Sequence, residues 1–274
     1  MVEKKKLLFV TQEMEPYTVL SEVSNVVKRL PEYMQSNGME IRVLMPRYGT
    51  INERRHRLHE VVRLSGMNII VDDDDYPLII KVASLPGARL QVYFLDNDDF
   101  FKRKSVFADE EGTPYEDNPD RMIFFCKGVI ETVRKFGWPP DIIHCHGWMT
   151  SLIPLYIREA YKTEPLFQNS KIIYSVYDTL MDSHFSEAFI EKASINNLVR
   201  EDLNAYLNGN QVYLHKGAIE YADALIQGSE QLPEDVEQLI LASGKPLLGF
   251  QNEDEQLAAY MDFYNTMLVE EEAV

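Results

Sequence analysis

The sequence has few cysteines, few basic residues for its length and no long apolar run. Its two cysteines, Cys126 and Cys145, lie in apolar segments and form no CxxC pair, so a disulfide framework is excluded and a reducing compartment fits. No segment approaches the roughly 18 apolar residues of a membrane span. The basic start is followed only by Leu7–Val10, which is far too short for a signal-peptide core. We therefore expect a soluble, cytoplasmic chain with no membrane partner.

Acidic side chains outnumber basic ones, 44 Asp and Glu against 27 Lys and Arg, which gives a formal net charge of −17. Such a chain repels a polyanion on average, so no nucleic-acid partner is expected. The acidic run Asp72–Asp75 lacks the ligand spacing of a calcium site and is expected to be a solvated loop. The local exception runs from Arg47 to Arg57 and includes Arg54 and Arg55. It is either an exposed basic loop or a place for an anion.

Short apolar segments alternate with amphipathic ones along the chain. The expected strands are Lys6–Gln12, Glu40–Met45, Val61–Ser65, Asn68–Val71, Leu78–Ala83, Leu90–Leu95, Asp141–Cys145, Lys171–Tyr177 and Ala224–Gln227. The expected helices are Ser21–Asn37, with a kink or break at Pro31, Asn118–Phe136, Trp148–Tyr161, Asn210–Tyr221, Pro233–Ala242 and Glu253–Leu268. This order predicts an α/β fold, a doubly wound Rossmann-like parallel sheet with inserted β-hairpins.

In a doubly wound sheet, ligands bind in the crevice at the carboxyl ends of the strands. The segments expected there are Glu13–Leu20, Pro46–Thr50, His144–Thr150 and Tyr177–Phe185. Side chains alternate along a strand, so His144 and His146 share one face and Cys145 takes the other. The two histidines are either a buried, hydrogen-bonded histidine beside a rim histidine, or a site for phosphate or a sugar hydroxyl. No carboxylate or third ligand stands nearby, so neither a metal nor another cofactor is expected.

Several short motifs occur in a characteristic order along the chain. They are Glu13-Met-Glu-Pro-Tyr17, Val43-Leu-Met-Pro-Arg-Tyr48, Asp117-Asn118 with Arg121, Asp141-Ile-Ile-His-Cys-His-Gly-Trp148, Pro154-Leu-Tyr156 and Lys216-Gly-Ala-Ile-Glu-Tyr-Ala-Asp223. Together they resemble the N-terminal domain of bacterial glycogen and starch synthases, the family 5 glycosyltransferases, over about Lys6 to Ser229. The resemblance implies the N-terminal half of a GT-B fold, in which two Rossmann-like halves face each other across the active site.

The same resemblance implies an activity and a set of site residues. The family transfers glucose from ADP-glucose to an α-1,4-glucan, and its N-terminal half mainly holds the acceptor glucan. Asp117 and His146 match active-site positions of the family and are the expected catalytic residues. The expected substrate-binding residues are Glu13, Tyr17, Asn118, His144, Trp148, Tyr177 and Lys216.

The chain departs from the family in the loop after the first strand. The family's Lys-x-Gly-Gly, whose lysine meets the phosphates of the nucleotide sugar, is replaced by Val19-Leu20-Ser21-Glu22. The cation is lost and a carboxylate is gained, which opposes a diphosphate. Two further departures are Gly147, where the family has aspartate, and Tyr177-Asp178, where it has His-Asn.

About 45 residues follow Ser229, too few for a second Rossmann-like half of roughly 100 residues. We therefore expect one domain over residues 1–230 and a helical extension over 231–274 that packs back on it. Three functions stay open. The first is a noncatalytic, regulatory subunit that binds an α-glucan or maltooligosaccharide. The second is a catalytic half completed by a separate nucleotide-sugar-binding chain. The third is a structural protein without a sugar ligand, for example a homodimer.

Overall fold

The structure, a computed structural model, describes residues 4–179 and 185–269. Its described strands form one 10-stranded sheet in the order β12-β11-β8-β7-β1-β2-β6-β5-β3, with β4 beside β5, and a separate hairpin of β9 and β10. The strands are β1 Lys6–Thr11, β2 Glu40–Pro46, β3 His59–Glu60, β4 Met67–Val71, β5 Asp74–Ser84, β6 Gln91–Asp96, β7 Ile142–His146, β8 Lys171–Val176, β9 Leu207–Asn208, β10 Gln211–Val212, β11 Ala224–Gln227 and β12 Leu247–Leu248. From β12 to β6 all neighbours pair in parallel, which confirms the predicted sheet.

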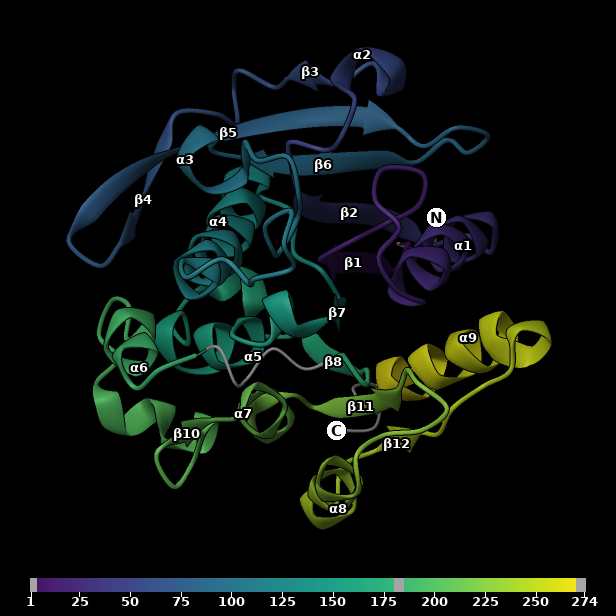
Figure 1. The fold of residues 1–274 in the computed structure, drawn as a ribbon. Helices are drawn as coiled ribbons and strands as arrows, with labels where there is room; N and C mark the ends of the chain where they lie inside the picture. Colours follow the sequence, from purple (N-terminus) through teal and green to yellow (C-terminus); the bar gives the residue numbers. More distant parts are fainter. Residues whose placement is uncertain (1–3, 180–184, 270–274) are drawn as a thin grey trace.

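The helices cover both faces of this sheet (Figure 1). They are α1 Val23–Ser36, α2 Glu53–His56, α3 Asp98–Phe101, α4 Asn118–Phe136, α5 Ile153–Leu155, α6 Ala188–Ala193, α7 Leu214–Tyr221, α8 Glu234–Ser243 and α9 Glu253–Val269. Shorter 3₁₀ turns span Trp148–Thr150, Pro165–Phe167 and Arg200–Tyr206, and a π-helical turn spans Tyr156–Ala160. The group of α4, α5 and α7 packs on one face and α1 with α9 on the other, as the right-handed crossovers of a doubly wound sheet require.

The central strands are apolar because helices cover them on both sides. In β1 the side chains of Leu7, Leu8, Phe9 and Val10 are all buried, and every residue of β7 is buried as well. Continuous burial is the usual pattern of a parallel sheet with two covered faces. Hairpins extend the sheet beyond β6, where β5 pairs antiparallel with both β6 and β4.

Several elements differ from the sequence prediction. The helix α1 is a single helix through Pro31, whose ring is buried, so the expected division is wrong. Residues 61–65 are not a strand, because the N–H groups of Leu64 and Ser65 both bond to the carbonyl of Val61 and close a turn. Part of the acidic run 72–75 is not a loop, since Asp74 begins β5.

Two expected helices are shorter or irregular. The segment 148–161 is divided into a 3₁₀ turn, α5 and a π-turn, in which Tyr161 N–H bonds to the carbonyl of Tyr156, five residues back. Pro154 in the first turn of α5 has no N–H with which to join the preceding turn. The helix predicted from Asn210 begins at Leu214, because Gln211 and Val212 pair with β9.

The last helix, α9, lies against α1 and reaches the middle of the sheet (Figure 1). Its buried residues include Tyr260, Tyr264, Met267 and Leu268. An ion pair from Arg29 of α1 to Glu253 holds its first turn. Among the described residues, no helix has both the length and the apolar character to cross a membrane. The division of the chain at residue 230 stays a prediction.

Candidate functional site

The ends of three neighbouring parallel strands bring part of the predicted site together, namely His144, His146 and Tyr177. The register pairs Thr11 of β1 with His146 of β7, and His146 with Ser175 of β8. Just beyond β7 the chain turns at Gly147 with φ +86°, where a Cβ would lie 2.3 Å from Cδ of Gln12. In this chain, therefore, only glycine fits the turn at position 147.

His144 and His146 form a fully buried pair whose ring centroids lie 3.8 Å apart, with the ring planes tilted by 42°. The Nδ1 and Nε2 atoms of His144 lie 2.6 Å from Tyr264 Oη and 2.7 Å from Ser175 Oγ. The Nδ1 atom of His146 lies 2.9 Å from the hydroxyl of Tyr177. Strand alternation correctly placed both histidines on one face.

Aromatic side chains of β1 and α9 pack against the histidine pair. The ring of Phe9 packs against the pair, with its centroid 5.9 Å from that of His144 and 6.1 Å from that of His146. Tyr260 and Tyr264 of α9 lie against His144 at 6.0 and 5.7 Å. The histidines are therefore not rim residues, since α9 encloses them. One ring nitrogen, Nε2 of His146, is buried without a hydrogen-bond partner among the described residues.

Burial keeps both rings neutral. It lowers the pKa of His146 to about 3. Burial and then the neighbouring His146 lower the pKa of His144 well below its usual value. A third buried histidine, His215, behaves similarly: burial lowers its pKa to about 4, and its Nε2 donates to the carbonyl of Tyr177. At neutral pH the pair can donate or accept a hydrogen bond, but it supplies no positive charge to a phosphate.

This burial predicts a pH dependence of stability. The folded-state pKa of His146 lies below the ordinary value near 6.5, so the unfolded chain takes up the proton first as the pH falls. The stabilising contribution is present above about pH 6.5 and is lost toward pH 3. In urea titrations between pH 6 and 4, His146→Gln should therefore show a slope shallower by about 1.4 kcal/mol per pH unit.

Tyr177→Phe is the control for this experiment. It removes the hydroxyl bound to His146 but leaves the imidazole buried. Its stability should fall by about 1 kcal/mol at every pH, with the slope of the unchanged chain. Equal slopes for His146→Gln and the unchanged chain would contradict the assignment of a buried neutral ring.

The loop after β1 folds around the carboxylate of Glu13, which is fully buried. Glu13 Oε2 accepts from the backbone N–H groups of Leu20 at 2.7 Å and Ser21 at 2.9 Å. Its Oε1 accepts from the Ser21 hydroxyl at 2.5 Å. The amides of the loop that would face an anion are thus already bonded to a carboxylate of the same chain.

A second carboxylate, that of Glu22, lies at the N-terminus of α1 without bonding to its N–H groups. Glu22 is the residue before the first turn of α1, and its Oε1 accepts a hydrogen bond from the hydroxyl of Ser229, which follows β11. The same hydroxyl oxygen accepts from the backbone N–H of Asp178 at 3.0 Å. The segments after β1, β8 and β11 are therefore joined across the end of the sheet by Glu22, Ser229 and Asp178.

Asp117 and Asn118 form a separate polar group at the start of α4. Arg103 binds both carboxylate oxygens of Asp117, at 2.8 Å for Nη1. Asn118 is buried and bonds to Nη1 of Arg121 at 2.6 Å and to the carbonyl of Phe107 at 2.9 Å. The negative charge of Asp117 is thus already paired, and the amide of Asn118 is used within the protein.

The remaining predicted residues serve packing in this structure. Tyr17 is buried, 4.9 Å from the rings of both His56 and Phe94, and burial raises its pKa to about 12. Trp148 is buried against Phe107 and Phe185. Lys216 lies on α7, where its ammonium donates to the carbonyl of Leu207 at 2.6 Å. Among the described residues, the ammonium of Lys216 bonds to Leu207 and not to the histidine pair. The roles predicted for all nine residues stay predictions.

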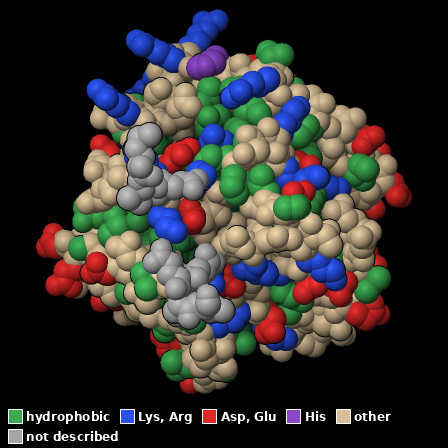
Figure 2. Space-filling model, turned by 180° about the vertical axis from the view of Figure 1, so that it is seen from behind, with side chains coloured by type: hydrophobic (Ala, Val, Ile, Leu, Met, Phe, Trp, Pro, Cys, Tyr) green, Lys and Arg blue, Asp and Glu red, His purple; other side chains and the backbone are tan. Residues whose placement is uncertain are grey.

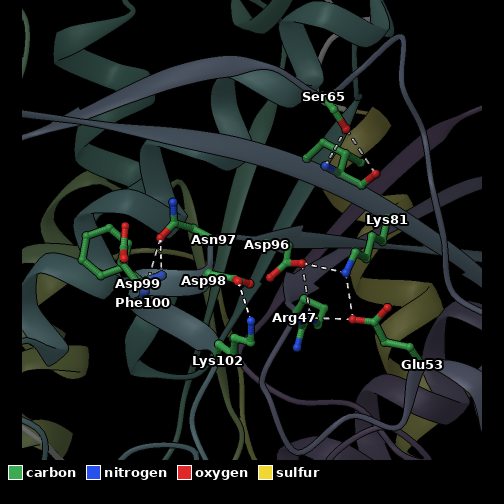
Figure 3. Close-up of polar contacts among 11 residues, drawn as sticks. Arg47, Glu53, Ser65, Lys81, Asp96, Asn97, Asp98, Asp99, Phe100 and Lys102 are labelled. Atoms are coloured by element: carbon green, nitrogen blue, oxygen red, sulfur yellow. Dashed lines mark hydrogen bonds and ion pairs between the residues drawn. The ribbon is translucent and has the colours of Figure 1, made fainter.

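A charged cluster joins the segment after β2 to β5 and β6; its four residues are Arg47, Glu53, Lys81 and Asp96 (Figure 3). Lys81 Nζ lies 2.9 Å from Asp96 Oδ2 and 2.7 Å from Glu53 Oε1. Arg47 Nε is 3.1 Å from Asp96 Oδ2, but is not aligned for a hydrogen bond, and its Nη2 is 3.1 Å from Glu53. The side chains of Asp96 and Arg47 are nearly enclosed, so this cluster is a buried structural network.

Sequence reasoning missed the residues that close the site. Arg103 binds Asp117, and Ser229 binds Glu22. Both Arg103 and Ser229 lie in loops whose positions depend on the fold. Tyr264 was visible as part of the apolar stripe of the last helix, but its histidine partner was not. Residues 180–184 of the predicted rim segment 177–185 lie outside the described residues. Across residues 4–179 and 185–269, no group of three His, Cys, Asp or Glu side chains could hold a metal ion.

Comparison with known proteins identifies relatives of this chain. The family described as "Starch synthase catalytic domain" matches residues 6–245. The glycogen synthase of Pelodictyon phaeoclathratiforme is 32% identical over 234 residues, which cover 84% of this chain and 47% of that protein. The glycogen synthase of Chlorobaculum tepidum is 34% identical over 228 residues, covering 82% and 46%. The chain spans about half the length of the curated relatives it matches.

A solved structure shares the fold. The catalytic domain of starch synthase IV from Arabidopsis thaliana, bound to ADP and acarbose, superposes with a TM-score of 0.75. The superposition covers 91% of this chain and 52% of that one, at 19% sequence identity. At this identity the likeness concerns the fold alone, and it agrees with the predicted half of a GT-B glycosyltransferase.

Proposed function

Because the chain belongs to the family of the starch synthase catalytic domain, we propose that it is a noncatalytic member that binds α-glucan. In this proposal the end of the sheet no longer receives the diphosphate of a nucleotide sugar. Of the two ligands named for the Arabidopsis starch synthase IV structure, ADP and acarbose, we carry over to this chain only a ligand of the second, sugar kind. A regulatory role as a partner subunit follows from binding without transfer.

The carboxylate of Glu22 is the observation that carries this proposal. The N-terminus of a helix attracts anions, because its N–H groups and the helix dipole point toward the ligand. Here Glu22 stands at that position in α1, bonded to Ser229, and Val19 replaces the lysine of the family motif. A second anion at this place would meet a carboxylate instead of an ammonium, which opposes diphosphate binding.

The exposed groups at the same end of the sheet suit a sugar better than a phosphate. Glu22, Asn25 and Asp178 are exposed there, and each can accept hydrogen bonds from sugar hydroxyls. The predicted aromatic contacts, Tyr17 and Trp148, are packed inside, so the sugar would be held by hydrogen bonds at the loop after β1. Asp117 and His146 would not act as catalytic groups, since the first is paired with Arg103 and the second is enclosed under α9.

The test is calorimetry with maltooligosaccharides, ADP and ADP-glucose on the full chain. The unchanged chain should bind a maltooligosaccharide and show no affinity for ADP-glucose. The double variant Val19→Lys/Glu22→Gln exchanges a repelling charge for an attracting one and retains an oxygen for Ser229. It should bind ADP at least about tenfold more tightly, since each 1.4 kcal/mol changes affinity tenfold.

The matched control is Val62→Lys/Glu32→Gln, which makes the same charge change at two exposed positions. It should leave ADP binding unchanged. Failure of the unchanged chain to bind any glucan, or ADP-glucose binding equal to that of the Val19→Lys/Glu22→Gln variant, would contradict the proposal.

A second candidate function is a catalytic half completed by a separate chain. It is favoured by the exposed apolar side chains of Val19 and Leu20, 69% and 49% exposed, in the loop after β1. Two side chains are a small patch compared with the several hundred Å² that mark an interface, so we prefer the noncatalytic function. Glucose transfer from ADP-glucose that begins only when a second chain is added would favour this alternative instead.

A further inference from the structure

A cationic groove lies at the end of the molecule formed by α2, β3 and the turn after β5. Its volume is about 740 Å³. The described residues that line it are Arg55, His56, Arg57, His59 and the segment from Ser84 to Ala88. Figure 2 shows Lys and Arg side chains gathered with a histidine at this end of the molecule. The groove stands out because the chain as a whole carries a net charge of −17.

The arginines of this groove have no acidic partner among the described residues. Glu53, the acid in α2, is already held by Arg47 and Lys81. Glu60 follows His59 in β3, and adjacent strand residues point to opposite faces of the sheet. No ion pair joins Arg55 or Arg57 to a carboxylate of residues 4–179 or 185–269, so their charges face the solvent of the groove.

Backbone and ring contacts hold the segment that carries these arginines in place. Arg55 N–H donates to the side chain of Asn52 at 2.9 Å, which caps α2. Arg57 ends α2, and its backbone is in the left-handed conformation with φ 55°. The ring of His56 packs edge to face on Tyr17 at 4.9 Å, and the hydroxyl of Tyr17 lies 3.5 Å from the carbonyl of Ser84 in the groove wall. The backbone that carries Arg55 and Arg57 is therefore held at the groove, and their exposed guanidinium groups extend from it.

The lining selects one chemical class of ligand. Guanidinium groups match the oxygens of a phosphate, and imidazoles add further donors. Among the described lining residues there is no Trp, Tyr or Phe to stack on a sugar ring or a nucleic-acid base. The volume lies within the range of about 300 to 1,000 Å³ typical of small-molecule sites. The overall negative charge of the chain disfavours a long polyanion.

We propose that this groove binds the phosphate group of a small phosphate monoester, through Arg55, Arg57 and His59. The site is separate from the histidine pair and from Glu22, and the inference does not depend on the proposed glucan binding. Its wall touches Tyr17, which belongs to the same loop as Leu20 and Ser21, so an occupied groove borders the segment that closes the end of the sheet.

The test compares two double variants of the full chain that each remove two arginines. Arg55→Ala/Arg57→Asn removes the groove cations, with asparagine chosen because it tolerates the left-handed conformation of position 57. Arg54→Ala/Arg63→Ala is the control, since both arginines are exposed and neither lines the groove. The probes are inorganic phosphate, glucose 6-phosphate and unphosphorylated glucose. Their binding is measured by the NMR signals of His56 and His59 and by calorimetry.

Phosphate and glucose 6-phosphate should shift the signals of both histidines in the unchanged chain and in the control. The Arg55→Ala/Arg57→Asn variant should bind at least about tenfold more weakly. Stronger binding of glucose 6-phosphate than of inorganic phosphate would support a phosphate monoester as the ligand. Weaker binding of glucose 6-phosphate than of inorganic phosphate would contradict it.

Three results with the small probes would overturn the proposal. They are no shift with either phosphate probe, equal weakening in both double variants, and an equal response to glucose, which would indicate a sugar site. Binding of an RNA oligonucleotide in preference to the small phosphates would also contradict it. Glu22→Gln changes the proposed glucan site and should leave phosphate binding at the groove unchanged. The test of phosphate binding and the test of glucan binding can therefore fail independently of each other.

Discussion

Replacing Tyr264 with alanine should lower the free energy of unfolding by about 3 to 5 kcal/mol, as large-to-small substitutions of buried aromatic residues do. Tyr264 is fully buried in α9, and its ring lies 6.5 Å from Phe9 of the central strand. The substitution opens a cavity between α9 and the sheet. It also leaves Nδ1 of His144 without its partner, because the hydroxyl of Tyr264 is 2.6 Å away. Urea titration at pH 7 measures the loss.

Two further variants separate the causes. Tyr264→Phe keeps the ring and removes the hydroxyl, so it should cost about 1 to 3 kcal/mol, the usual penalty for a buried polar group left unbonded. Phe263→Ala, in the next position of the same helix, removes an aromatic ring that is only partly buried and should cost less than Tyr264→Ala.

A chain ended before Pro246 would lose both β12 and α9, and should melt at a lower temperature than the full chain. If this shortened chain melts like the full one, α9 does not stabilise the domain, and the interpretation of Tyr264 is wrong.

Asp96→Ala should cost a similar amount, about 3 to 5 kcal/mol, which is typical of removing one partner from a buried ion pair. The side chain of Asp96 is 5% exposed, and those of Arg47 and Lys81 are 10% and 18% exposed. Without Asp96, Arg47 and Lys81 share the single carboxylate of Glu53 (Figure 3). The free energy of unfolding falls because two enclosed cations keep only half of their counter-charge.

Asp98→Ala is the matched control, two positions along the chain. Asp98 pairs with Lys102 at 2.7 Å, but both side chains are more than 60% exposed. Water screens this pair, so its removal should change the free energy of unfolding by less than about 1 kcal/mol, and by less still at high salt. Urea titration in low and high salt measures both variants. Similar losses for Asp96→Ala and Asp98→Ala would contradict the assignment of a buried network.

Much of the fold was predictable because its signals are local. The continuous apolar run Leu7–Val10 predicts a strand covered on both faces, and burial of all four side chains agrees with it. The helix Asn118–Phe136 was predicted with the observed bounds, since Asn-Pro opens it and Gly137 ends it in the left-handed conformation. The turn at residues 61–65 was missed because β-branched and apolar residues there suggested a strand, whereas local backbone hydrogen bonds prevail.

The candidate site was predictable in part. Alternation along β7 placed His144 and His146 on one face, and the motif order identified the family. The state of these residues was not predictable. Asp117 is neutralised by Arg103, fourteen positions earlier, and His144 is covered by Tyr264, which lies 120 positions later in the chain.

By itself, the amino-acid sequence determined the parallel α/β architecture, the family and the loss of the lysine in the loop after β1. These follow from periodicity and residue type, which depend only on near neighbours along the chain. Only the tertiary structure decided that the histidines are enclosed, that Glu13 bonds to the amides of its loop while Glu22 bonds to Ser229, and that Arg55 and Arg57 line a groove without acidic partners among the described residues. Burial and charge pairing arise between segments far apart in sequence, so they exist only once the sheet and its last helix have assembled.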